Sequence, residues 1–183
     1  MEKTLADTLL HHDFRTVELE FRVGIQTSRG FHASLPKIAW TQAMEKLGKG
    51  KEVVIVDKYV STRGSCSSRH VQAGGAMYWE HKQKVSNDVT PGKFAIRTSL
   101  ALETKEKGAP PNSYVLQRTK HRTSFPKGPW QIDFTRVETI PNKDDIEETY
   151  EIEVELKDTG YLFEKELNLV IAEGIALAQN ITM

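Results

Sequence analysis

Apolar and polar residues alternate one by one in many short segments of this chain, and this alternation restricts what the chain can fold into. The segment Thr16–Ile25 reads TVELEFRVGI, with an apolar residue at nearly every second position. Successive side chains of a strand point to opposite faces, so the pattern predicts a strand with one apolar and one polar face. Such segments, separated by turn residues, indicate a mainly antiparallel sheet or barrel. The other predicted strands are Glu52–Ser61, Arg69–Gln72, Met77–Val85, Lys93–Thr104, Tyr114–Phe125, Trp130–Ile140 and Thr149–Lys157.

Two helices are expected beside these strands. Ser34 followed by Pro36 is typical of a helix N-cap and first turn, and Gly48 is suited to end that helix. The apolar residues that can share one face of this helix are Ile38, Ala39, Met44 and Leu47. The segment Leu162–Gln179 lacks proline and favours a second helix, packed on the outside of the sheet. Its apolar residues are Leu167, Val170, Ile171, Ile175 and Leu177.

Length and composition exclude several classes of protein. A chain of 183 residues fits one domain, 1–183, with a real core, and 38% hydrophobic with 27% charged residues is typical of a globular protein. A single cysteine, Cys66, excludes an internal disulfide and a multi-cysteine metal site. A formal net charge of zero argues against a protein that coats nucleic acid over its whole surface. No secretory signal and no membrane-spanning apolar run are recognisable, and 1–15 and 138–148 receive no clear assignment.

The polar faces of the predicted strands each carry one sign of charge. Glu151, Glu153 and Glu155 occupy one face of YEIEVEL, whereas Arg118, Lys120 and Arg122 occupy one face of QRTKHRT. Like charges at this spacing repel each other, so each row needs the opposite sign nearby. A closed barrel meets this need if the charged faces point into a water-filled lumen and the apolar faces point outward onto helices. An outward-facing polar sheet is the alternative.

The opposed rows also suggest a chemistry. Carboxylates at i and i+2 on a strand lie about 7 Å apart, so an oxygen site for Mg²⁺ or Mn²⁺ needs a further carboxylate from a neighbouring strand. The pair Glu18/Glu20 and the row that ends at Glu155 can supply it, although either row alone is more simply a solvated edge strand. The arginine–lysine row, with a second basic pair at Lys82 and Lys84, suits phosphate oxygens. Together they suggest a metal–polyphosphate site.

These motifs resemble the triphosphate tunnel metalloenzymes, and more narrowly the fungal, protozoan and viral RNA triphosphatases of mRNA capping. VELEFRVG and EIEVEL resemble the paired glutamate motifs of that family. Between them, in order, lie SLALE, QRTKHRT and WQIDFTRV, which match three further strands. The resemblance covers roughly 16–157. It implies a mainly β (α+β) fold, a closed eight-stranded antiparallel barrel with flanking helices.

The resemblance also implies roles for individual residues. Metal ligands would be Glu18, Glu20 and Glu155. Lys120 and Arg122 would contact the γ-phosphate, with Arg118 as a further tunnel contact. Glu103 and Glu153 would position or activate the attacking water. Glu151 and Asp133 would brace basic residues through ion pairs, and Thr135 would also face inward. Another phosphate contact would come from Arg69, or else Arg63, and a further basic position from Lys82 or Lys84.

The implied reaction is removal of the γ-phosphate from the 5′-triphosphate end of RNA, the first step of mRNA capping, with Mn²⁺ or Mg²⁺ as cofactor. Nucleoside triphosphates (NTPs) would be further substrates, and an RNA guanylyltransferase would be a partner. A cellular eukaryotic enzyme would act in the nucleus and a viral one in the cytoplasm, and neither would be secreted or membrane-bound. Two alternatives stay open: a hydrolase of tripolyphosphate or thiamine triphosphate with the same fold, and a non-catalytic nucleic-acid-binding barrel. The branch of the superfamily that acts on small polyphosphates typically has the motif ExExK in its first strand. This chain has Arg22 at the position of that lysine.

Overall fold

A computed structural model describes residues 1–61, 66–141 and 147–183, and it is dominated by long antiparallel strands. The predicted strands are all present with shifted bounds, and β5 is the longest. The strands are β1 (Val17–Thr27), β2 (Gly30–His32), β3 (Lys51–Ser61), β4 (Cys66–Ala73), β5 (Ala76–Thr90), β6 (Ala95–Glu106), β7 (Leu116–Lys127), β8 (Trp130–Pro141) and β9 (Glu147–Leu156). The helices are α1 (Glu2–His11), α2 (Lys37–Glu45) and α3 (Leu167–Ile181), with 3₁₀ turns η1 (Phe14–Thr16) and η2 (Thr159–Phe163).

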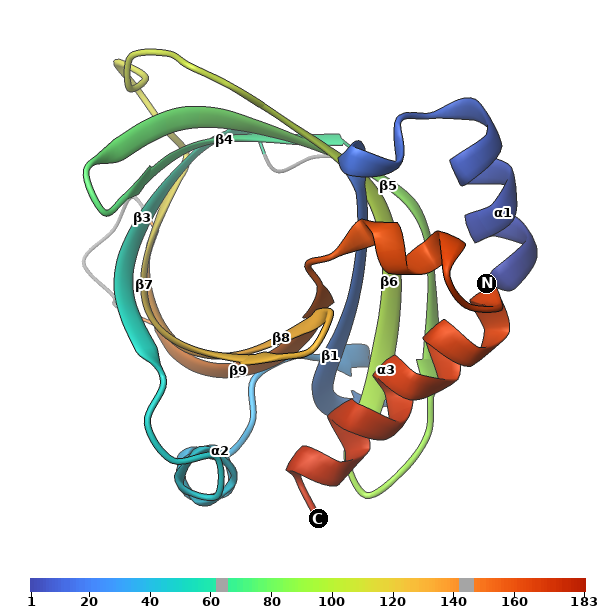
Figure 1. The fold of residues 1–183 in the computed structure, drawn as a ribbon. Coiled ribbons are helices and arrows are strands. Elements are labelled where there is room, and N and C mark those ends of the chain that lie inside the picture. The colour runs from blue at the N-terminus through green and yellow to red at the C-terminus, as the bar shows by residue number, and fades with distance from the viewer. Residues whose placement is uncertain (62–65, 142–146) are drawn as a thin grey trace.

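Eight of these strands close into a barrel, seen along its axis in Figure 1. The order is β1-β6-β5-β4-β3-β7-β8-β9, and β9 pairs with β1 to complete the circle. All pairings are antiparallel, which confirms the predicted eight-stranded barrel. The short β2 folds back on the last residues of β1 as a hairpin outside the ring of eight. We call the barrel opening beside this hairpin the β2 end.

The hydrophobic core lies outside the barrel, between its wall and the helices. Phe21, Ile152 and Val154 point outward from β1 and β9 and are fully buried beneath this layer. Figure 1 shows α1 and α3 stacked beside β1 and β6, while α2 lies below β9. Strand alternation then turns the charged residues inward, as expected. The outward apolar residues of β3 and β5 are not covered in this way, since Val54 is 52% and Met77 50% exposed.

The helices differ in detail from the sequence prediction. Ser34 does not cap α2: the Oγ atom of Ser34 accepts a hydrogen bond from the Tyr150 amide, which ties the segment before α2 to β9. The predicted face of α2 was wrong at Ile38, which is 73% exposed, because Trp40 turns toward the barrel and packs on Phe134 and Tyr150. In α3 the predicted apolar residues do pack on the core, but the helix begins at Leu167.

The unassigned N-terminal segment forms α1, a helix whose Leu5 is fully buried and which packs on α3. None of the helices in the described ranges is both long and apolar enough to span a membrane.

A glycine allows α3 to approach the barrel closely. A Cβ atom on Gly174 would stand 2.2 Å from the Phe21 ring, closer than any real contact. Gly174→Val should therefore lower the free energy of unfolding by about 1–3 kcal/mol, although valine usually suits a helix better than glycine. Urea unfolding monitored by circular dichroism measures this change. An unchanged or higher stability would show that α3 packs differently, and Leu169→Val, at a 47% exposed position of α3, is the control.

Candidate active site

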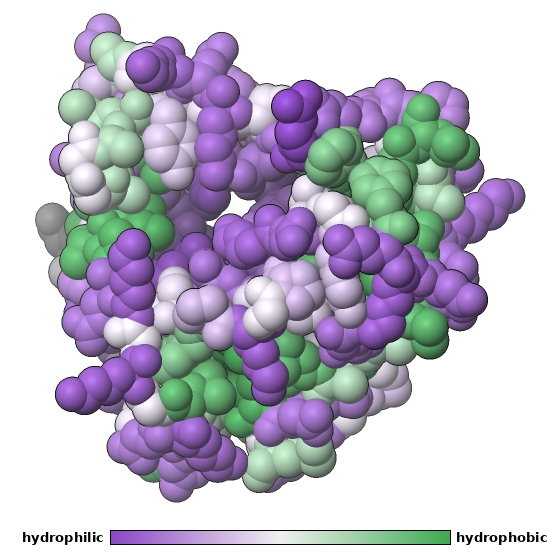
Figure 2. All heavy atoms as spheres, viewed as in Figure 1, coloured by the Kyte–Doolittle hydropathy of each residue, from purple (hydrophilic) through white to green (hydrophobic). Residues whose placement is uncertain are grey.

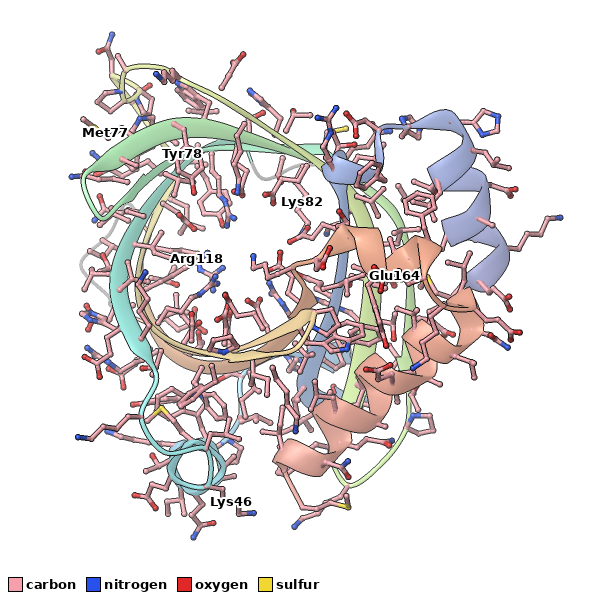
Figure 3. All side chains as sticks on the ribbon, in the orientation of Figure 1. Lys46, Met77, Tyr78, Lys82, Arg118 and Glu164 are labelled. Atoms are coloured by element: carbon pink, nitrogen blue, oxygen red, sulfur yellow. The ribbon has the colours of Figure 1, made fainter. Side chains whose placement is uncertain are left out.

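The barrel encloses a cavity of about 350 Å³ lined almost entirely by charged and polar side chains. Its opening is visible in Figure 2 as a recess bordered mainly by hydrophilic residues. In Figure 3, Lys82 and Arg118 extend into the lumen from opposite sides of the wall. The predicted inward orientation of the charged faces is therefore present, and the outward-facing alternative is excluded.

The two glutamate-rich strands lie side by side. The register of β1 with β9 places Glu20 directly opposite Glu155, and Glu18 precedes Glu20 on the same face. Opposed residues on antiparallel strands have Cβ atoms only about 5 Å apart. The side chains of Glu20 and Glu18 are 8% and 13% exposed. Residues from the two ends of the chain thus form one acidic wall.

Lysines pair with the glutamates of this acidic wall. Lys82 Nζ pairs with Glu18, lies 3.5 Å from Glu20 Oε2, and Lys157 Nζ lies 2.6 Å from Glu155. The described residues contain no group of three carboxylates or histidines already close enough to hold a metal. Lys82 Nζ lies between the carboxylates of Glu18 and Glu20.

Two carboxyl groups of the acidic wall have raised pKa values, chiefly because they are buried. Burial, followed by the charge of Glu20, raises the pKa of Glu18 to about 8 despite the opposing Lys82. Burial also raises the pKa of Glu155 against the effect of Lys157. Glu18 Oε2 is buried and faces the Lys82 ammonium in an ion pair. A donor set of carboxylate oxygens from Glu18, Glu20 and Glu155 fits a hard divalent cation such as Mg²⁺ or Mn²⁺.

The basic row lies on β7, with each cation held by a carboxylate. Arg118 pairs with Glu151 at 2.5 Å, and Arg122 pairs with Asp133 at 3.0 Å and Glu153 at 3.2 Å. Thr135 Oγ1 accepts a further bond from Arg122 Nε. These partners, all on β8 and β9, fix the direction of two guanidinium groups along the lumen wall.

Asp57 connects the basic row to Arg69 and was not singled out from the sequence. This fully buried carboxylate lies 2.5 Å from Lys120 Nζ and 3.0 Å from Arg69 Nη1. Burial opposes its ionisation, but Lys120 and Arg69 outweigh burial and lower the pKa of Asp57. The pKa of Lys120 is lowered as well, because burial and repulsion by Arg69 together exceed the attraction of Asp57. Asp57 is therefore an anion that holds two cations at the lumen.

Glu153 and Arg22 form a second buried ion pair in the acidic wall. Burial opposes ionisation of Glu153, but Arg22 and Arg122 hold its pKa well below the ordinary range. Such a carboxylate can orient a water molecule but is a poor proton acceptor. Glu103, on β6 opposite Lys82, is less enclosed, with an 18% exposed side chain that pairs with Lys105.

The structure places every other predicted site residue that it describes in the same barrel. Lys84 is exposed and lines the cavity next to Lys82, whereas Arg69 reaches the lumen from β4 and also pairs with Glu80. Arg63 lies outside the described residues. The charged residues lining the cavity that sequence reasoning did not assign to the site are Arg22, Asp57, Glu80, Arg97, Lys105 and Lys157, and Tyr59 lines the cavity as well. A lone aspartate in the apolar strand VVIVDKYV was the signal available for Asp57.

The raised pKa values predict how stability depends on pH. Glu18 and Glu155 bind protons more tightly in the folded state than in the unfolded state, so metal-free protein loses stability as pH rises from about 4.5 to 8. Carboxylates with lowered pKa, such as Glu20 and Glu153, change their contribution only below pH 4.5, so their stabilisation is constant across this window. We expect the melting temperature to fall across this range with EDTA and to fall less, or rise, with Mn²⁺. Identical curves with and without Mn²⁺ would contradict a metal site at these glutamates.

Comparisons with known proteins agree with this geometry. The family model described as "mRNA capping enzyme, beta chain" matches residues 81–167. The "5'RNA triphosphatase A449R" of Paramecium bursaria Chlorella virus 1 is 55% identical over 183 residues, covering 98% of this chain and 95% of the relative. Among solved structures, the S. pombe Pct1 RNA triphosphatase superposes with a TM-score of 0.73 at 18% identity, covering 98% of this chain and 87% of the other. The PH1819 protein of Pyrococcus horikoshii OT3 gives 0.52 at 13% identity, covering 90% and 89%.

A closed eight-stranded barrel with a lumen of paired acidic and basic rows defines the class of triphosphate tunnel enzymes, which in general depend on a metal ion. The structural likenesses support this fold, and the viral relative narrows the assignment because its identity extends over nearly the whole of both chains. The chain belongs to the RNA 5′-triphosphatase family of this class, in its viral branch. The predicted resemblance is therefore confirmed.

Proposed function

We propose that this protein uses Mn²⁺ or Mg²⁺ to remove the γ-phosphate from triphosphate-ended RNA as the first step of mRNA capping, with residues 1–183 acting as one domain. The observation that carries the proposal is the β1–β9 register, which sets Glu20 opposite Glu155 in a lumen that also contains Lys120 and Arg122. The family supports the same substrate, because the viral relative carries the name of an RNA triphosphatase.

Glu18, Glu20 and Glu155 would hold the cation. Once bound, the cation would offset the negative charge of the triphosphate and polarise the γ-phosphate. The raised pKa of Glu18 means that this carboxyl must lose its proton for binding, so metal affinity should increase with pH up to about 8. Lys82, released from Glu18 and Glu20, would then be free to contact a phosphate oxygen.

Lys120 and Arg122 would stabilise the charge that develops on the γ-phosphate in an in-line transition state. Asp57 holds the Lys120 ammonium at the lumen wall, and Asp133 holds the Arg122 guanidinium. Arg69 and Arg118 would bind further phosphate oxygens from neighbouring positions, and Glu151 would brace Arg118. Groups oriented in this way before the substrate arrives need little rearrangement during reaction.

An attacking water would be oriented by Glu103 or Glu153. The strongly lowered pKa of Glu153 favours an orienting role for this residue rather than proton abstraction. Glu153→Gln should therefore slow phosphate release without shifting the acidic limb of the pH–rate profile. A loss of that limb would instead identify Glu153 as the general base.

The direct test follows ³²P release from γ-labelled, triphosphate-ended RNA with Mn²⁺ or Mg²⁺. We expect release of inorganic phosphate and a diphosphate RNA end, and none with EDTA. NTPs and tripolyphosphate at equal concentration serve as comparators. A preference for tripolyphosphate over RNA would assign the protein to small-polyphosphate hydrolysis. No metal-dependent release from any of them would identify a non-catalytic barrel.

Protein partners can be tested separately. Pct1 has been solved in complex with the Spt5 CTD, and we propose that this protein likewise works with other components of transcription and capping, including a guanylyltransferase. Its place of action would be the compartment in which capping occurs, the nucleus for a cellular enzyme and the cytoplasm for a viral one. Affinity purification of the tagged protein from cells that express it tests this association, and a guanylyltransferase should co-purify.

A further inference from the structure

Two cations in the lumen stand apart because no carboxylate pairs with them. Of the lysines and arginines that line the cavity in the described ranges, only Lys84 and Arg97 make no ion pair. The others are held by the acidic rows or by buried partners such as Asp57. Two cations without counter-ions in an otherwise balanced lumen indicate that an anionic ligand reaches them.

Lys84 and Arg97 lie on neighbouring strands along one path through the barrel. Lys82 is opposite Glu103, and Lys84, one step nearer the β2 end, is opposite Ala101. The pairing of β5 with β6 shifts register after Lys84. Arg97 lies on β6 four residues before Ala101, which corresponds to about 13 Å along the strand toward the β2 end. The path from Lys82 to Arg97 is therefore much longer than one phosphate, and it suits a chain of phosphates.

The Arg97 side chain is positioned before any ligand binds. Its guanidinium lies over the Phe31 ring at 4.9 Å from the centroid, and Phe31 belongs to the β1–β2 hairpin. Phe31 can lie there because residue 24 is a glycine: a Cβ on Gly24 would stand 2.4 Å from the ring. Arg97 Nε is nevertheless buried without a hydrogen-bond acceptor, a cost that an incoming anion would offset. Burial and then Arg22 lower the pKa of Arg97, and the carboxylates of Glu20, Glu153 and Glu151 act in the opposite direction without offsetting them.

We propose that Lys84 and Arg97 form a second anion subsite, which holds RNA phosphodiester groups that follow the 5′ triphosphate. This inference rests on the proposed function, since it requires the γ-phosphate to lie near Lys120 and Arg122. A free NTP ends at its first nucleoside and cannot fill the whole path, whereas RNA continues toward the β2 end. The subsite thus favours RNA ends over free nucleotides, and the RNA leaves the barrel beside Phe31.

The test compares Arg97→Gln, Lys84→Gln and the double variant with Lys46→Gln, whose side chain lies on the outside of the barrel beyond α2 in Figure 3. Substrates are a triphosphate-ended oligoribonucleotide, ATP and long-chain polyphosphate, each over a series of salt concentrations. We expect the double variant to raise KM for the RNA at least about ten-fold, with a clearly smaller effect for ATP. The slope of log KM for RNA against log salt should fall by about 0.7 for each cation removed.

Four outcomes would overturn the subsite. These are an equal loss for RNA and ATP, no loss for either, an unchanged salt slope, or a loss confined to polyphosphate. Wild-type protein that releases no phosphate from RNA would overturn the proposed function instead, so the two failures are distinguishable. Melting temperatures of the variants control for folding, and Arg97→Lys, which keeps the charge, should recover part of the RNA preference.

Discussion

Glu18→Gln is expected to abolish metal-dependent phosphate release while making the metal-free protein more stable. The activity should fall about a thousand-fold, because a bound metal contributes several kcal/mol to the transition state and each 1.4 kcal/mol is a factor of ten. Stability should rise because Glu18 is a buried carboxylate beside Glu20, Glu103 and Glu155, and those repulsions, after burial, keep its pKa at about 8. An amide of the same shape removes the repulsion and keeps the packing.

The opposite signs of these two effects separate a metal ligand from a structural residue. Phosphate release measures the first effect, and melting temperature with EDTA or Mn²⁺ measures the second. The Mn²⁺-induced rise in melting temperature should be lost in Glu18→Gln. Glu147→Gln, at an exposed glutamate of β9, is the matched control and should behave as wild type. A destabilised variant that retains Mn²⁺ binding would show that Glu18 is only a structural partner of Lys82.

The barrel could be predicted from the sequence because the alternation of apolar and polar residues that specifies it lies within single strands. Alternation in TVELEFRVGI and YEIEVEL fixes which residues face inward on each strand, whatever the partner strands are. The pairing of β1 with β9 is not local, and the argument for it came from charge: two acidic rows at opposite ends of the chain become a site only when adjacent. The observed register, with Glu20 opposite Glu155, supplies that adjacency.

The partners inside the lumen could not be predicted in the same way. Asp57 follows four apolar residues in its strand, and nothing local indicates its partners. Those partners, Arg69 and Lys120, are known only once β3 is placed between β4 and β7. Ser34 has the sequence context of a helix cap, but its hydroxyl oxygen instead accepts a hydrogen bond from the Tyr150 amide of β9. Whether a cation is paired, as Lys82 is, or unpaired, as Lys84 is, likewise depends on strands distant in sequence.

Asp57→Leu is expected to be among the most destabilising single substitutions in the lumen. The carboxylate is fully buried, and its loss leaves Lys120 without its counter-ion while Arg69 keeps Glu80. Removing one member of a buried ion pair typically costs about 3–5 kcal/mol, because the remaining charge is left desolvated. Urea unfolding should show this loss as a lower midpoint with an unchanged slope. The exposed Asp7→Ala on α1 is the control, expected to change stability by less than about 0.5 kcal/mol.

A double variant distinguishes the stability role of Asp57 from its part in the reaction. Asp57→Leu with Lys120→Met removes both charges, so it should recover much of the stability lost in Asp57→Leu. Phosphate release should stay as low as in Lys120→Met alone, because the ammonium that faces the γ-phosphate is gone. Recovery of activity in the double variant would show that Lys120 contributes only structure. Failure to recover stability would show instead that Arg69, rather than Lys120, is the cation that depends on Asp57.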